Sequence, residues 1–179
     1  MADQLTPRAR EIVVAARDLL DEHGAESLTM RRLADQLGIR APSLYKHLPD
    51  KAALEAAVIA SGLEDLAGEL AAAVESAAEP LSALAAAYRG FALAHPHLYL
   101  LITNRPLPRN RLPAGVEDRA AAPLLRATGD RALARAFWAF GHGLVTLELA
   151  GRFPPDADLD AAWQAGIASF STSAAVRSG

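Results

Sequence analysis

The sequence predicts an all-α protein, and three observations support this fold class. Alanine, the residue with the highest helix propensity, occurs 41 times in the 179 residues, against 12 glycines. Apolar residues recur at the three- and four-residue spacings of amphipathic helices over most of the chain. Cysteine is absent and aromatic residues make up only 6%. The core therefore has to be aliphatic, and a disulfide framework, thiolate zinc sites and a cysteine nucleophile are excluded.

The first fifty residues predict three helices and the start of a fourth. Thr6 caps the first helix, and Thr29 caps a short second helix that ends at Gly38. Pro42 starts a third helix only long enough to hold Leu44, Tyr45 and His47. Two short helices joined by a glycine-containing turn are typical of a helix-turn-helix. Its small core is predicted to consist of Leu28, Leu33, Leu37, Ile39, Leu44 and Leu48.

Beyond residue 51 the pattern changes to longer helices. Asp50 is a good N-cap for a long alanine-rich helix. The most regular segment is 131–150, where apolar residues alternate spacings of three and four, typical of a coiled-coil-like seam. We expect helices over residues 51–78, 80–94, 116–127, 131–150 and 158–172, a short apolar piece at 98–102 and a loop with three prolines at 104–115.

Charge is distributed unevenly along a chain whose formal net charge is −3. Residues 31–51 carry five basic and two acidic side chains, and both lysines of the protein, Lys46 and Lys51, lie there. A solvated helix face would explain this positive segment. A surface that contacts DNA phosphates is the alternative.

The sequence shows no segment that addresses the chain to a membrane. No apolar run approaches the roughly 18 residues needed to span a bilayer. The first residues, MADQLTPRAREIV, lack the basic-then-apolar order of a signal peptide. We therefore expect a soluble cytoplasmic protein with no membrane partner.

Residues 28–51 closely resemble the DNA-binding segment of tetracycline-repressor (TetR) family regulators. That family's pattern is a Thr-started helix, a glycine turn, a short recognition helix ending in Leu-Tyr-x-His/Tyr-Phe/Leu, and a lysine opening the fourth helix. All of these elements occur in the segment LTMRRLADQLGIRAPSLYKHLPDK. The stretch APSLYKH is similar to the tetracycline repressor itself.

The C-terminal half carries a second resemblance. The segment FWAFGHGLVTLELAGRF, residues 137–153, resembles the Trp-x-x-x-His-Gly helix of one subgroup of TetR-family effector domains. Residues 91–99, FALAHPHLY, resemble the helix-break-helix of the same subgroup. The proline loop at 104–115 departs from that pattern.

These resemblances imply a ligand-responsive repressor that binds a palindromic operator in double-stranded DNA as a homodimer and is released by a small apolar effector. They imply a DNA-binding domain at 1–50, an effector-binding and dimerisation domain at 51–173 and a flexible tail at 174–179. An effector-independent DNA-binding activator or architectural regulator is the alternative. We expect no enzyme, cofactor or metal, because no His-Glu-x-x-His, Gly-x-Ser-x-Gly or phosphate-loop spacing occurs.

The family positions assign DNA contacts residue by residue. Side chains expected at base edges are Arg31, Pro42, Ser43 and Lys46. Side chains expected at phosphates are Thr29, Arg40, Tyr45, His47 and Lys51. Two of these have a structural alternative: Tyr45 as a core aromatic and His47 as the end of a helix.

The family's effector pocket and dimer interface also map onto this sequence. Candidate pocket residues are Tyr88, Phe91, Tyr99, Ile102, Phe140 and His142. Candidate interface residues are Phe137, Leu144, Trp163, Ile167 and Phe170. For both sets, packing within one chain is the alternative. By analogy with the family, effector binding would shift the population towards a spacing of the two DNA-binding heads that no longer fits DNA.

Overall fold

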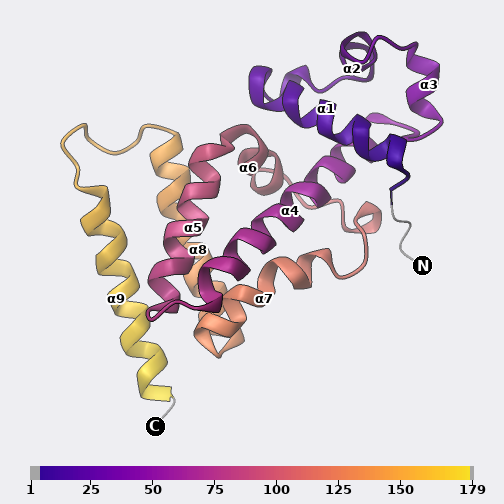
Figure 1. The fold of residues 1–179 in the computed structure, drawn as a ribbon. Coiled ribbons are helices and arrows are strands. Elements are labelled where there is room, and N and C mark those ends of the chain that lie inside the picture. Colours follow the sequence, from indigo (N-terminus) through magenta and orange to yellow (C-terminus); the bar gives the residue numbers. More distant parts are fainter. Residues whose placement is uncertain (1–4, 178–179) are drawn as a thin grey trace. The chain divides into compact units, whose positions relative to one another are not determined.

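The computed structural model describes the backbone of residues 5–177 and the side chains of residues 5–171. Within this described part, the chain consists of nine α-helices and two short 3-10 helices without a strand, which confirms the all-α prediction (Figure 1). None of the described helices is long and apolar enough to cross a bilayer. The elements are α1 (Pro7–His23), η1 (Ala25–Ser27), α2 (Met30–Gln36), α3 (Ala41–Tyr45), α4 (Lys51–Glu75), α5 (Pro80–Ala94), α6 (Pro96–Thr103), η2 (Arg109–Arg111), α7 (Val116–Thr128), α8 (Arg131–Leu149) and α9 (Leu159–Arg177).

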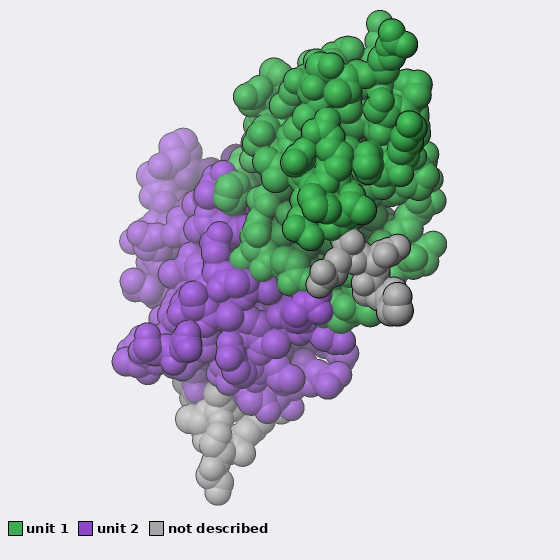
Figure 2. Space-filling view, turned by 45° about the vertical axis from the view of Figure 1, so that its right-hand side comes forward, with its two compact units in different colours: residues 1–65, 95–117 green, residues 66–94, 118–179 purple. Residues whose placement is uncertain are grey.

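The chain forms two compact units, coloured separately in Figure 2. Unit 1 contains residues 1–65 and 95–117, and unit 2 contains residues 66–94 and 118–179. Helix α4 is continuous and contributes its first part to unit 1 and its last part to unit 2. The compact units do not coincide with the boundary expected between a DNA-binding and an effector-binding domain after residue 50. That functional boundary therefore stays a prediction.

Helix starts in unit 1 follow the capping signals in the sequence. The Thr6 hydroxyl accepts a hydrogen bond from the Ala9 N–H at 3.2 Å, which satisfies one of the free donors of the first turn of α1. At the other end of this helix, Gly24 adopts a φ of 75°, a conformation that glycine reaches without a Cβ clash. The signals for starting and stopping this helix are therefore local.

The core of unit 1 holds the short helices in place. Helix α1 packs against α2, η1 and α6, and α2 packs against α3. Leu28, Leu33, Leu44 and Leu48 are buried, as predicted. The other two predicted core residues, Leu37 and Ile39, are only half-buried.

Helix α6 packs closely on α4 within unit 1. A Cβ added at Gly62 of α4 would lie 2.9 Å from a methyl carbon of Leu98 and 2.9 Å from one of Ile102. Real Cβ atoms do not approach other heavy atoms so closely. The glycine therefore lets the α6 side chains reach the backbone of α4.

Unit 2 is built on α5, α8 and α9, which pack against one another in pairs. The rings of Phe137 and Phe170 meet edge to face at a centroid distance of 5.3 Å, and those of Phe140 and Trp163 at 5.5 Å. A Cβ added at Gly166 would lie 2.1 Å from Cζ of Phe140. The Phe140 ring thus occupies the space beside α9 that the glycine leaves open.

An ion-paired arginine joins the same three helices. Arg89 of α5 donates to the Glu148 carboxylate of α8 at 2.7 and 3.0 Å, and to Asp160 of α9 at 2.6 Å. Hydrogen bonds to Glu148 and then Asp160 raise the pKa of Arg89 above its ordinary value, which keeps the guanidinium charged. Because the bond to Glu148 is bidentate, it fixes direction as well as distance.

Two helix ends differ from the sequence-based expectation. Helix α4 ends at Glu75 rather than near residue 78, because residues 76–79 form the turn that leads into α5 at Pro80. Helix α9 continues to Arg177, past the expected start of the tail at 174, because no glycine or proline stops it there. Residues 178–179 of the expected tail lie outside the described residues.

The contact between Gly166 and Phe140 predicts a large effect of a single methyl group. We expect Gly166→Ala to lower the free energy of unfolding by about 1–3 kcal/mol, the typical cost of overpacking a core. The matched control is Gly90→Ala on α5, where no heavy atom lies within 4 Å of the added carbon. This control is expected to stabilise the protein by about 0.5–1 kcal/mol, since alanine favours a helix interior over glycine. Chemical denaturation measures both, and equal free energies for the two variants would contradict the packing described.

Candidate DNA-binding surface and effector pocket

A single buried leucine orients the side chains of α3. The Leu44 side chain is 0% exposed, whereas its neighbours Pro42, Ser43 and Tyr45 are exposed. The Tyr45 side chain is 48% exposed, so the alternative that Tyr45 is a core aromatic does not hold. Helix α3 and the following turn therefore present their polar side chains to solvent, including Lys46.

His47 serves as the end of the helix and leaves its ring exposed. Its N–H donates to the Leu44 carbonyl at 2.9 Å, in a turn that closes α3. Its side chain is exposed. The structural alternative for His47 and a contact with DNA are thus compatible.

The start of α2 places a hydroxyl and two cations close together in the sequence. Thr29 accepts from the Arg32 N–H at 3.3 Å, as an N-cap does, and its hydroxyl hydrogen remains able to donate. Arg31 and Arg32 are exposed. Arg40, directly before α3, is exposed as well.

At the start of α4, acidic groups surround the lysine. The Asp50 carboxylate accepts from the Ala53 N–H at 2.7 Å and caps the helix, as predicted. This hydrogen bond and the nearby Arg111 guanidinium lower the pKa of Asp50. Lys51 is exposed, and its Nζ lies 3.5 Å from the Glu55 carboxylate one turn later.

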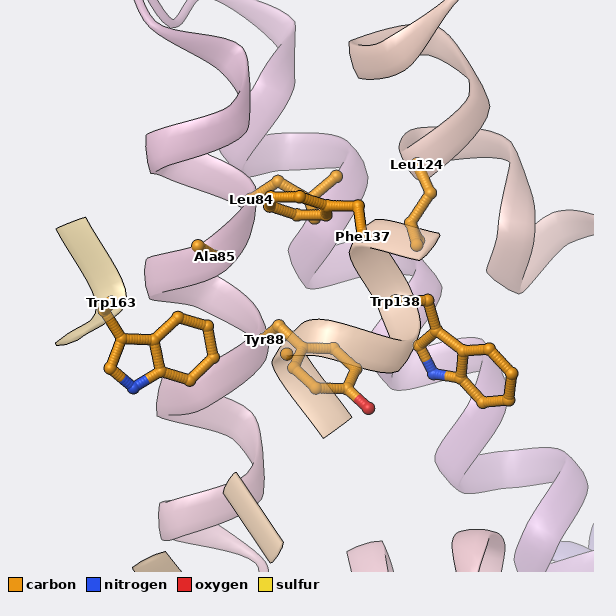
Figure 3. Close-up of a pocket in the computed structure, with 8 residues that line it drawn as sticks. Leu84, Ala85, Tyr88, Leu124, Phe137, Trp138 and Trp163 are labelled. Carbon is orange, nitrogen blue, oxygen red and sulfur yellow. The ribbon is translucent and has the colours of Figure 1, made fainter. Parts of the chain in front are cut away.

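Unit 2 contains a small apolar cavity, shown in Figure 3. Its volume of about 10 Å³ leaves room for no more than about one water molecule. Trp138 is 50% exposed, whereas Trp163 is buried. The lining residues are Leu84, Ala85, Tyr88, Leu124, Phe137, Trp138, Gly141 and Trp163.

The lining agrees with the sequence analysis at one residue, Tyr88. Phe91 is buried, Phe140 packs against Gly166, and neither lines this cavity. Tyr99 and Ile102 belong to unit 1, so a pocket that includes them stays a prediction. Trp138 and Gly141 were not among the candidate pocket residues, although both lie in the stretch that resembles the Trp-x-x-x-His-Gly helix. For Leu124, no sequence signal indicated the cavity.

His142 lies beside the cavity without lining it. Its ring stacks on that of Trp138 at a centroid distance of 6.2 Å, and its Nδ1 lies 3.4 Å from Oγ1 of Thr146. Partial burial lowers the pKa of His142, which favours the neutral form of the ring. The described residues hold no group of three or more His, Asp or Glu side chains arranged to bind a metal.

The five candidate interface residues differ in how much surface they offer. Phe137 is 2% exposed and Trp163 is 5% exposed, so neither has much surface left for a second subunit. Leu144, Ile167 and Phe170 are half-buried. The interface assignment stays a prediction, and the structure adds the packing role of the first two.

Small residues form a further stripe on α8 and α9. On α8 they recur at spacings of three and four and include Gly143, and on α9 they follow the same rule. Because small side chains bury little area, hydrophobic periodicity alone does not single out the alanines of this stripe. The exposed or half-buried members are Ala132, Ala136, Ala139 and Gly143 on α8 and Ala161, Ala165 and Ala168 on α9.

Two family models match the chain. Residues 12–58 match the bacterial regulatory proteins of the tetR family. Residues 81–170 match the tetracyclin repressor-like C-terminal domain.

Individual relatives agree with these matches. An uncharacterized HTH-type transcriptional regulator of Mycobacterium tuberculosis is 34% identical over 161 residues, covering 84% of this chain and 73% of the relative. The class D tetracycline repressor of Escherichia coli is 52% identical over 46 residues, covering 25% of this chain and 21% of that protein.

Solved structures share the fold. A protein of unknown function from Rhodococcus sp. RHA1 has a TM-score of 0.73 at 28% identity, over 92% of this chain and 93% of that one. A TetR variant from Acinetobacter baumannii AYE, in complex with minocycline, has a TM-score of 0.62 at 26% identity, over 93% of this chain and 94% of that one.

The exposed second helix of a helix-turn-helix, followed by a helical domain with an apolar cavity, defines a DNA-binding transcriptional regulator. More narrowly, the chain belongs to the TetR family of transcriptional regulators. The relative from Mycobacterium tuberculosis, which is similar over most of this chain, is a transcriptional regulator by its description.

Proposed function

We propose that this protein is a ligand-responsive repressor that binds a palindromic operator as a homodimer and is released by a small apolar effector. The observation that carries the proposal is the exposed surface of residues 42–47 above the buried Leu44. Apart from Pro42, the exposed side chains of this surface all carry a polar group. Such a surface is suited to the major groove of DNA.

The chemistry of α3 and α2 supports contacts with base edges. The Ser43 hydroxyl both donates and accepts, and the Lys46 ammonium favours the O6 and N7 acceptors of guanine. Pro42 offers an apolar contact to a thymine methyl group. Arg31, exposed on α2, can bind guanine with two parallel hydrogen bonds.

Five side chains around this surface suit the phosphate backbone. Thr29 and Tyr45 can donate through their hydroxyls, and Tyr45 is exposed enough to do so. Arg40 and Lys51 are exposed cations, and the exposed His47 ring can donate a hydrogen bond. Phosphate contacts fix the position of the protein on DNA without reading sequence. The set is Thr29, Arg40, Tyr45, His47 and Lys51.

A homodimer is supported by the exposed face of α8 and α9. A single head reads only a few base pairs, and a two-fold symmetric dimer doubles the site. Alanine and glycine at Ala139, Gly143 and Ala165 allow helices of two subunits to approach closely, with half-buried Leu144, Ile167 and Phe170 at the edge. Aromatic contacts between Phe137 and Phe170 and between Phe140 and Trp163 join the two helices.

An effector site in unit 2 is supported by the cavity and by the relatives. The lining is apolar and aromatic, as ligand pockets are. One solved TetR variant of the same fold holds minocycline. The stretch from Trp138 to Gly143 supports placing the chain in the Trp-x-x-x-His-Gly subgroup.

The small size of the cavity favours a second candidate, an activator or architectural regulator that needs no effector. Pockets for drug-sized ligands are ~300–1,000 Å³, far above the volume found in unit 2. An effector therefore has to enlarge the cavity, and the half-exposed Trp138 is the lining side chain best placed to move. If no small molecule changes the affinity of the protein for DNA, the second candidate function is the correct one.

Selection from random duplex DNA at two salt concentrations tests the DNA-binding function. We expect a palindrome, bound with steep salt dependence, since each phosphate contact releases counterions. Lys51→Ala is expected to weaken binding to all sequences and to reduce the salt slope by about one unit. Recovery of no enriched sequence would contradict the proposal, and an unchanged slope would remove Lys51 from the phosphate contacts.

Intrinsic fluorescence tests the effector site, because the only two tryptophans, Trp138 and Trp163, both line the cavity. We expect apolar compounds that release the operator to change the emission of the wild-type protein. The change should persist in Trp163→Phe and be largely lost in Trp138→Phe, since the exposed indole has to move. A compound that releases DNA without changing the emission of the wild-type protein or of Trp163→Phe would show that the effector binds elsewhere.

A charge on the small-residue stripe tests the dimer. We expect Ala165→Glu to give monomers by light scattering, because two carboxylates would face each other across a symmetric interface. Ala121→Glu, at an exposed alanine on α7, is the matched control and should leave dimers intact. Persisting Ala165→Glu dimers would show that the interface lies on another face.

A further inference from the structure

The loop between α6 and α7 contacts the start of α4. Nη1 of Arg111 lies 3.0 Å from Oδ1 and 3.1 Å from Oδ2 of Asp50. Nη1 of Arg105 lies 3.9 Å from Oε1 of Glu55, and its Nη2 lies 3.7 Å from Glu26. All of these residues belong to unit 1. The proline loop that departs from the family pattern therefore lies at the DNA-binding part of the chain.

The two carboxylates that receive these arginines flank the lysine expected at a phosphate. Asp50 precedes Lys51, and Glu55 holds the Lys51 ammonium at 3.5 Å. Taken alone, these three side chains carry a net charge of −1 at neutral pH, which repels a DNA phosphate. With Arg105 and Arg111, and with Glu26, the other carboxylate that pairs with Arg105, the net charge becomes 0. The loop therefore cancels the surplus of negative charge at this end of α4.

The acid at position 50 has a separate structural role that explains its presence. Its Oδ1 caps α4 through the Ala53 N–H, a bond that stabilises the first turn. An aspartate cap brings a negative charge, whereas asparagine caps equally well without one. A neighbouring cation is therefore needed if Asp50 is to cap the helix beside a phosphate.

We infer that Arg111 and Arg105 are positioning residues for DNA binding, which neutralise Asp50 and Glu55 so that Lys51 can meet a DNA phosphate without a surplus of negative charge around it. This inference rests on the proposed function of the α2–α4 segment. Both arginines act through the carboxylates and through Lys51, rather than by binding DNA themselves.

The same loop provides a matched control. Arg109 is also an exposed cation, but its Nε pairs with Glu117 at 3.1 Å, and the acids that flank Lys51 are paired with other arginines. Arg109→Ala removes the same charge from the same loop. It leaves the pairs of Asp50 and Glu55 in place.

The experiment measures the Kd of the full-length protein for its selected operator duplex at two salt concentrations, with thermal unfolding of each variant as a folding check. We expect Arg111→Ala to raise the Kd about tenfold at low salt and less at high salt, because these exposed charges are screened. Arg109→Ala should change the Kd little. Arg105→Ala should act in the same direction as Arg111→Ala.

Rescue distinguishes this role from a purely structural one. Adding Asp50→Asn to Arg111→Ala keeps a helix cap and removes the uncompensated charge, so it should return the Kd close to the wild-type value. Failure of this rescue, or equal Kd values for Arg111→Ala and Arg109→Ala, would overturn the inference. Both outcomes presuppose a wild-type protein that binds the duplex. A wild-type protein without DNA affinity overturns the proposed function instead.

Discussion

The packing of one leucine into the core of unit 1 is the constraint on which the proposed DNA-binding surface depends. Helix α3 has only five residues, and isolated helices shorter than ~12–15 residues are marginal in water. Leu44 is its only buried residue and meets a core that contains Leu28 and Leu33. Because Leu44 fixes the rotation of the helix, the directions of Ser43, Tyr45 and Lys46 follow from the same contact.

Segments far apart in the sequence complete this unit. Residues 95–117 follow α5 in the chain, yet they belong to unit 1 together with the DNA-binding helices. Helix α6 reaches the α4 backbone at Gly62, and the next loop reaches Asp50 at the start of the same helix. Helix α4 begins in unit 1 and ends in unit 2.

Large and small apolar residues of α8 and α9 have different roles in unit 2. Large aromatic side chains such as Phe137 and Trp163 are buried and line the cavity. The exposed residues include small ones such as Ala139 and Ala165, besides the larger Trp138 and Leu147. A search for interface residues by hydrophobicity finds the first group, because its members bury the most area. The surface of α8 and α9 that is free to contact a second subunit can be identified only when the structure shows which of their residues are buried within the chain.

Local signals in the sequence determined the helices, the caps at Thr6, Thr29 and Asp50, and the helix-turn-helix, because each depends on residues within one turn. Burial of most of the small core and the exposed cations of residues 31–51 were also predictable from pattern and charge. The tertiary structure alone decided that Trp138 and Leu124 line one cavity and that Arg111 lies beside Asp50, 61 residues away in sequence. Such contacts join separate helices, and no periodicity within a single helix specifies its neighbour.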